Sequence, residues 1–90
     1  MTTQELDDIL KARGRADEMS DIAAKLGFTL EFIAKNVLSS AGTVTVSQVA
    51  MLWQGMPNKH DRKRTRALFE ALSDAGLLAP TGDDETWTKL

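Results

Sequence analysis

The sequence contains no cysteine and a single histidine, His60. The lack of cysteine excludes disulfide bonds, thiolate catalysis and cysteine-ligated zinc or iron–sulfur clusters. One histidine excludes metal sites built from several histidines, and we expect no bound metal or other cofactor. No apolar run approaches the roughly 18 residues that a membrane helix needs, and residues 1–10 lack the basic and then apolar layout of a signal peptide. A folded cytoplasmic protein that makes no membrane contact is the simplest expectation.

Ninety residues are enough for one domain and too few for two independent cores. Hydrophobic residues make up 42% of the chain and charged residues 27%, which is typical of folded domains and unlike disordered chains. The sequence has no phosphate-binding loop, nucleophile elbow or dinucleotide fingerprint, and so short a chain rarely encloses a substrate cavity. We therefore expect a binding protein and not an enzyme.

The first half of the sequence predicts three helices from apolar residues at helical spacing. The first begins at Thr2, which has the spacing of a capping box with Glu5, and its narrow apolar stripe is formed by Leu6, Ile9 and Leu10. This narrow stripe predicts a peripheral helix, packed on the edge of the domain or on a second copy. The second helix runs from about residue 17 to residue 26. The third is capped by Thr29 and carries the most regular apolar face, formed by Leu30, Ile33, Ala34, Val37, Leu38 and Ala41.

The second half predicts a short strand, two more helices and a β-hairpin. The β-branched run of residues 43–46 favours a strand, and Ser47 is a candidate cap for the helix that follows. The turn at residues 54–58 contains Gly and Pro and ends that helix. Asn58 or Asp61 caps the next helix, which ends at Gly76. Residues 77–79 and 86–90 then predict two strands around a turn at residues 80–84.

Basic residues are concentrated at the start of the last predicted helix. Five of the 11 Lys and Arg residues, together with the one histidine, fall within eight positions: Lys59, His60, Arg62, Lys63, Arg64 and Arg66. At helical spacing, Arg62, Lys63 and Arg66 face solvent together, whereas Arg64 lies near the edge of the buried face. Such a run is often only a solvated surface, and it opposes the helix dipole at a cost on the order of a few tenths of a kcal/mol per charge. It is also the local feature that a polyanionic partner would recognise.

From residue 29 onward, the order helix, strand, helix, turn, helix and hairpin resembles the winged helix-turn-helix superfamily. Residues 45–50 (TVSQVA) resemble the start of the second helix of that fold, and residues 67–78 (ALFEALSDAGLL) resemble its recognition helix and the exit into the wing. The resemblance covers about two thirds of the chain. It implies a mainly α fold with a small β-hairpin, in which residues 29–90 form the winged-helix domain. Residues 1–28 then supply extra N-terminal helices, packed on the domain or at a dimer contact.

The resemblance also implies that the helix starting near Asp61 enters the major groove of double-stranded DNA. The candidate DNA-binding residues are Ser47, Lys59, His60, Arg62, Lys63, Arg64 and Arg66. Arginine pairs bidentately with guanine, whereas lysine and hydroxyl groups mainly contact phosphate. We therefore expect a small transcriptional regulator that binds two half-sites as a homodimer.

Two other interpretations remain open. The predicted tip of the wing carries Asp83, Asp84 and Glu85, which phosphate would repel, so the alternative is a winged-helix module that binds protein. In that case the basic helix docks onto an acidic surface and the acidic wing onto a basic one. A second helix-turn-helix candidate, residues 21–28 followed by Ile33, would expose Glu31, Lys35, Asn36 and Ser39. That face has little positive charge, so two core helices meeting at a glycine turn is the favoured interpretation.

Overall fold

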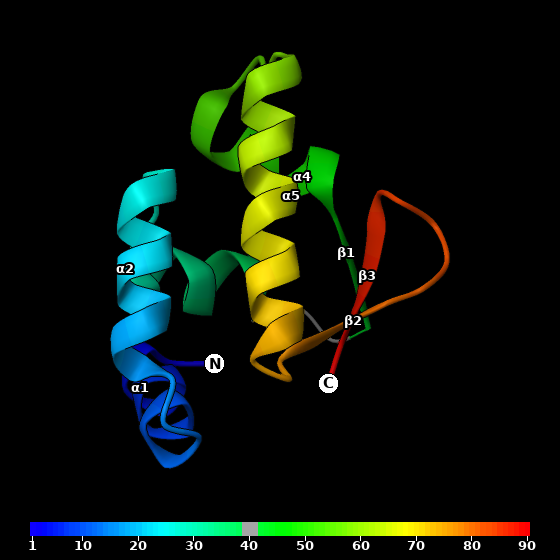
Figure 1. The fold of residues 1–90 in the computed structure, drawn as a ribbon. Helices are drawn as coiled ribbons and strands as arrows, with labels where there is room; N and C mark the ends of the chain where they lie inside the picture. The colour runs from blue at the N-terminus through cyan, green and yellow to red at the C-terminus, as the bar shows by residue number, and fades with distance from the viewer. Residues whose placement is uncertain (39–41) are drawn as a thin grey trace.

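The structure, a computed structural model, describes residues 1–38 and 42–90. Ser39 and Ala41, which the sequence places on the third helix, lie outside the described residues. The elements follow in the order α1 (Thr3–Ala12), α2 (Ala16–Leu26), α3 (Leu30–Phe32), η1 (Ile33–Val37), β1 (Thr43–Thr45), α4 (Val46–Gln54), α5 (Lys59–Asp74), β2 (Leu78–Pro80) and β3 (Thr86–Lys89). The described chain is therefore mainly helical with a small antiparallel sheet, as expected. Figure 1 shows α5 between α2 on one side and the strands on the other.

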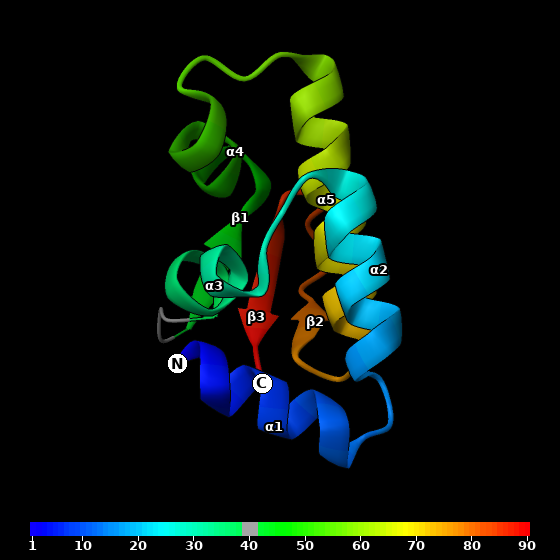
Figure 2. The same cartoon turned by 90° about the vertical axis from the view of Figure 1, so that its left-hand side faces the viewer.

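The first helix packs on the end of the domain and contributes to its core, which is the first of the two arrangements expected for a peripheral helix. Thr2 caps α1, because its side chain accepts a hydrogen bond from the Glu5 amide. Leu6 and Leu10 are fully buried in the same hydrophobic cluster as residues of α5 and the sheet. Figure 2 shows α1 lying across one end of the molecule, below α3 and the strands. A narrow stripe suffices here because α1 covers the end of a core that other elements build.

The third helix departs from its predicted geometry. Only three residues of α3 are α-helical, and the chain then continues in the wider π-helical turn η1. Most of the apolar face is confirmed where it is described, since Ile33, Ala34, Val37 and Leu38 are fully buried, whereas Leu30 is only partly buried. Periodicity could not reveal the change of turn because η1 is held by packing on both sides, against α1 and against α4. Tertiary packing therefore decides the geometry of this segment.

The three strands form one antiparallel sheet in the order β1-β3-β2. The predicted hairpin is confirmed with its first strand shifted by one residue, and β1 joins it along the other edge of β3. Trp87 on the central strand lies opposite Val44 of β1 and Pro80 of β2. Proline is tolerated at this place because β2 is an edge strand. The sheet thus pairs the strand that precedes α4 with the hairpin that follows α5.

The caps of α4 and α5 fix where the two helices begin. Thr45 caps α4 by accepting a hydrogen bond from the Gln48 amide, so the prediction of Ser47 as the cap was wrong by two residues. The cap falls on Thr45 because β1 ends there in an extended conformation. Asn58 caps α5 in a reciprocal capping box with Asp61, which confirms one of the two predicted caps. The start of the basic helix is therefore set by side chains as well as by the preceding turn.

Residues of α1 and α2 and residues of 29–90 share one hydrophobic core. Leu6, Leu10, Met19 and Ala23 belong to the same cluster as Phe69, which α5 places against the edge of the Trp87 ring. Residues 1–28 are therefore packed on the rest of the chain. Within the described residues, no helix has both the length and the apolar character needed to cross a membrane.

Candidate nucleic-acid interface

The first two turns of α5 line a hollow of about 350 Å³, and we call it the basic hollow. Its lining residues are Lys59, Arg62, Lys63, Arg66 and Glu85. The four cations come from one face of α5, as helical spacing predicts, and the carboxylate comes from the loop between β2 and β3. The structure therefore brings four of the seven predicted site residues together around one concave surface.

Three of these cations have no acidic partner in the described structure. Lys59, Arg62 and Lys63 are exposed and form no ion pair within residues 1–38 and 42–90. Asp61 is the one acid within the basic run, but it is only 6% exposed. Its carboxylate accepts a hydrogen bond from the Asn58 amide at 3.0 Å and is thereby committed to the cap. The exposed cations thus remain available to an external anion.

Arg66 lines the hollow beside Arg62 and Lys63, as expected, but unlike them it has an acidic partner within the described residues. Its Nη2 atom lies 2.8 Å from Oε1 of Glu85, and 39% of its side chain is exposed. The other carboxylate oxygen of Glu85, Oε2, accepts a hydrogen bond of 3.2 Å from the Ser47 hydroxyl. The main-chain carbonyl of Glu85 accepts a further hydrogen bond from the Val46 amide at 2.9 Å. Pairing of β1 with β3 brings residue 85 to this place, and the sequence alone gives no sign of that pairing.

Arg64 and His60 do not line the basic hollow. His60 is exposed, whereas Arg64 reaches back to the end of α2. Both Nε and Nη2 of Arg64 donate hydrogen bonds to the carbonyl of Leu26, the first at 3.1 Å, and its guanidinium lies 5.0 Å from the centre of the Trp53 ring. The prediction that Arg64 sits near the edge of the buried face is confirmed. Its contacts are those of a residue that joins two helices.

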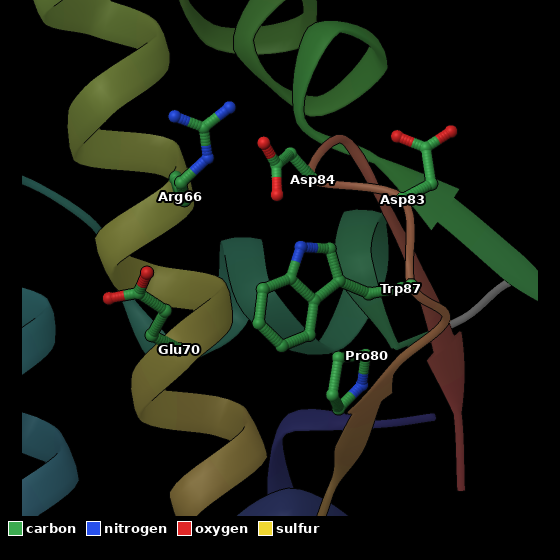
Figure 3. A pocket seen from close by; sticks show the side chains of 7 residues that line it. Arg66, Glu70, Pro80, Asp83, Asp84 and Trp87 are labelled. Carbon is green, nitrogen blue, oxygen red and sulfur yellow. The ribbon is translucent and has the colours of Figure 1, made fainter.

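A second concave surface, the hairpin hollow, has a volume of about 370 Å³ and lies on the other side of Arg66. Its lining residues are Arg66, Glu70, Pro80, Gly82, Asp83, Asp84 and Trp87. Figure 3 shows the carboxylate of Asp84 turned toward Arg66 and the indole nitrogen of Trp87 turned toward Asp84. Nε of Arg66 and Nε1 of Trp87 are buried and have no hydrogen-bond partner in the part of the chain that the structure describes. Nη2 of Arg66 therefore donates a hydrogen bond to Glu85, whereas its Nε has no acceptor among the described residues.

The acidic loop is ordered by its own side chains. Asp83 accepts hydrogen bonds from the Glu85 amide at 2.9 Å and, more weakly, from the Thr86 hydroxyl at 3.4 Å. The sequence places Glu85 in the acidic run that would repel DNA or bind protein, and it does not predict the ion pair of Glu85 with Arg66. The only signal for this ion pair in the sequence was an acidic run on the predicted hairpin that follows a basic run on the preceding predicted helix.

An apolar patch lies next to the turn that leads into α5. Met51 and Leu52 of α4 are each 59% exposed, and Met56 in the turn is 91% exposed. Met51 and Leu52 also line a groove of about 430 Å³ together with Asn36, Val44, Gln48 and Val49. Clusters of exposed large apolar side chains are features of contact surfaces.

Ionisable side chains outside the hollows form local pairs. The pKa of Lys11 is raised, mainly because its ammonium group hydrogen-bonds to Asp7, and the pKa of Glu31 is lowered, mainly because it accepts a hydrogen bond from Lys35. Both are exposed pairs four residues apart along the chain. No group of three or more His, Asp or Glu side chains in the described part of the chain is arranged to hold a metal ion.

No similarity to a known protein indicates a function for the basic hollow. No protein-family model matches the chain, and no curated protein and no solved structure matches it at a significant level. The function proposed below is therefore inferred from the residues of this chain and from their arrangement.

Proposed function

We propose that the chain is a small DNA-binding protein that regulates transcription and places α5 in the major groove of double-stranded DNA. The observation that carries the proposal is the set of three exposed cations, Lys59, Arg62 and Lys63, on one face at the start of α5. They line a common hollow and form no ion pair within the described residues. The start of the recognition helix is the part that contacts bases and phosphates in helix-turn-helix proteins.

The order of the elements supports a winged helix-turn-helix arrangement. A short strand, two helices and a hairpin follow α3 and η1, and the first strand pairs with the last. The turn between α4 and α5 and the hairpin beside α5 correspond to the turn and the wing of that fold (Figure 1). In this arrangement α5 is the recognition helix, and Ser47 near the start of α4 faces the DNA backbone.

Electrostatics favours a polyanion as the partner. Cations near the start of a helix oppose its dipole, and the first two turns of α5 carry Lys59, Arg62 and Lys63. The acid of the first turn, Asp61, is buried and bound in the cap, so none of these exposed cations is compensated by an ion pair within the described residues. DNA phosphates supply that compensation and release counterions on binding. Arg62 is suited to bidentate contact with guanine, whereas Lys59 and Lys63 are suited to phosphate.

The test is a titration of a labelled duplex of random sequence, followed by fluorescence anisotropy across a salt series. Three phosphate contacts predict a slope of about −3 in the plot of log affinity against log salt. The double variant Arg62→Gln/Lys63→Gln should lower the magnitude of the slope to about 1. The control Lys11→Gln/Lys25→Gln removes the same charge from α1 and α2 and should retain most of the slope. Equal losses in the two variants, or no duplex binding at low salt, would contradict the proposal.

The proposal includes a homodimer, because two recognition helices read half-sites about one helical turn apart. The contact between the two copies cannot use Leu6 and Leu10, since both are fully buried within the chain. The protein would act in the cytoplasm, as we expect from its sequence.

The second candidate function is a module that binds protein through this same region. The exposed side chains of Met51, Leu52 and Met56 favour it, because a contact surface gains more from burying such groups than from burying charge. Absence of duplex binding by a folded wild-type chain at low salt would make this candidate the working function.

A further inference from the structure

We propose that Glu85 is an internal competitor for DNA phosphate, which occupies an anion-binding position on α5 until a duplex displaces it. The inference rests on the proposed function and deepens it, because it identifies a residue that sets the strength of non-specific binding. Among the described residues, the carboxylate of Glu85 is the only anion that lines the basic hollow, and the other four lining residues are cations.

The contacts of the Glu85 carboxylate are those that a phosphate group would make. One oxygen accepts from the guanidinium of Arg66 at 2.8 Å, and the other accepts from the hydroxyl of Ser47 at 3.2 Å. Arginine and serine are both common donors to DNA phosphate oxygens, and the two residues come from the two helices of the proposed helix-turn-helix. Arg66 and Ser47 therefore form an anion-binding site that the Glu85 carboxylate occupies.

The side chain of Glu85 can leave this site without unfolding the hairpin. The Arg66 and Glu85 side chains are 39% and 41% exposed, and a solvated ion pair of this kind adds little stability. The backbone of residue 85 is held separately, since its amide donates to Asp83 and its carbonyl accepts from Val46. A phosphate can thus replace the carboxylate while the loop keeps its conformation.

The competition gives the acidic loop a role that is compatible with DNA binding. Any duplex must displace Glu85 before Arg66 and Ser47 can contact phosphate, so the affinity for all sequences is lowered. A site that also offers good base contacts to Arg62 offsets this cost, whereas a random sequence has no such contacts. Because the same displacement cost applies to every duplex, Glu85 lowers specific and non-specific affinity by the same factor, leaves their difference unchanged, and sets how weak the non-specific binding is.

The experiment compares Glu85→Gln with Asp84→Asn in the same anisotropy titration with a random duplex at low salt. Both variants remove one negative charge from the same loop, but Asp84 makes no hydrogen bond or ion pair within the described residues. We expect Glu85→Gln to bind roughly fivefold more tightly than the wild type, because the release of Arg66 no longer requires breaking an exposed ion pair worth up to about 1 kcal/mol. Asp84→Asn should gain less than about threefold, as expected for a screened, exposed charge.

A double-mutant cycle with Arg66→Gln tests the mechanism. In that background, the gain from Glu85→Gln should fall to the level of Asp84→Asn, because no arginine remains to be released. Persistence of the full gain, or equal gains from Glu85→Gln and Asp84→Asn in the wild-type background, would overturn the inference while leaving DNA binding intact. If neither the wild type nor Glu85→Gln binds the duplex, the proposed function itself fails. Thermal unfolding of each variant, with Glu85→Ala as a second substitution, verifies that the chains compared are folded.

Discussion

At the scale of single residues, two neighbouring arginines that look alike in the sequence have different contacts. Arg62 is exposed and lines the basic hollow, whereas Arg64 donates to the Leu26 carbonyl and stacks over Trp53. Trp53 in turn donates a 3.1 Å hydrogen bond to Thr65 and meets the Phe28 ring edge to face. Arg64 thus belongs to a set of contacts that joins α2, α4 and α5.

This difference predicts opposite results for two substitutions. Arg64→Ala should lower the free energy of unfolding by about 1 kcal/mol, because charge-assisted hydrogen bonds to an unpaired helix carbonyl are lost. Its salt slope for duplex binding should stay close to that of the wild type. Arg62→Ala should reduce the magnitude of that slope by about 1 and leave stability almost unchanged. Urea denaturation and anisotropy measured on both variants check the pair, and an exchange of the two effects would contradict the assignment.

At the scale of secondary-structure elements, helix starts depend on single side chains that local sequence alone does not always identify. The cap of α5 could be predicted, because Asn58 follows a Gly and Pro turn and has Asp61 three residues later. The cap of α4 could not, because Thr45 and Ser47 are both good caps and the choice depends on where β1 ends. The extent of β1 is set by its pairing with β3, a contact between segments far apart in the sequence.

The corrected cap of α4 can be tested with a matched pair of substitutions. Thr45→Ala should lower the free energy of unfolding by about 1 kcal/mol, because the Gln48 amide loses its partner. Ser47→Ala removes a hydroxyl two positions away whose one hydrogen bond within the described residues goes to the partly exposed Glu85 carboxylate, so its effect on stability should be within about 0.5 kcal/mol. Chemical denaturation of the two variants compares them directly. A larger loss for Ser47→Ala would restore the prediction made from the sequence.

At the scale of the whole molecule, sequence periodicity predicted which residues are buried better than it predicted which elements meet. The apolar faces predicted for α1 and for the described part of the third helix pack into the core, with Ile9 and Leu30 only partly buried. The π-helical turn, the pairing of β1 with β3 and the ion pair of Arg66 with Glu85 were not predictable. Each of these depends on contacts between elements, and apolar spacing within one element carries no information about its neighbours.

The position of α1 gives a prediction at this scale. Leu6→Ala should lower the free energy of unfolding by about 2 to 5 kcal/mol, because it leaves a cavity in the shared core. Ile9→Ala, on the same helix but only partly buried, should cost clearly less. Denaturation midpoints of both variants measure the difference. Similar small losses for both would mean that α1 packs only at the edge of the domain, as its narrow stripe suggests.

The pairing of β1 with β3 also has a consequence for the order of folding. Thr45 and Thr86 are partners in the sheet although about 40 residues separate them in the chain, and closing so long a loop costs entropy before the contacts compensate for it. Helices form from local contacts and are expected to fold ahead of such pairings. The hydrogen bond between Ser47 and Glu85 joins residues 38 apart in the chain, so it forms late in folding together with this pairing. Arg66 and Glu85 are only 19 residues apart, so their ion pair needs only α5 and the hairpin. The anion site around Glu85 is therefore completed in two stages, first by Arg66 and last by Ser47.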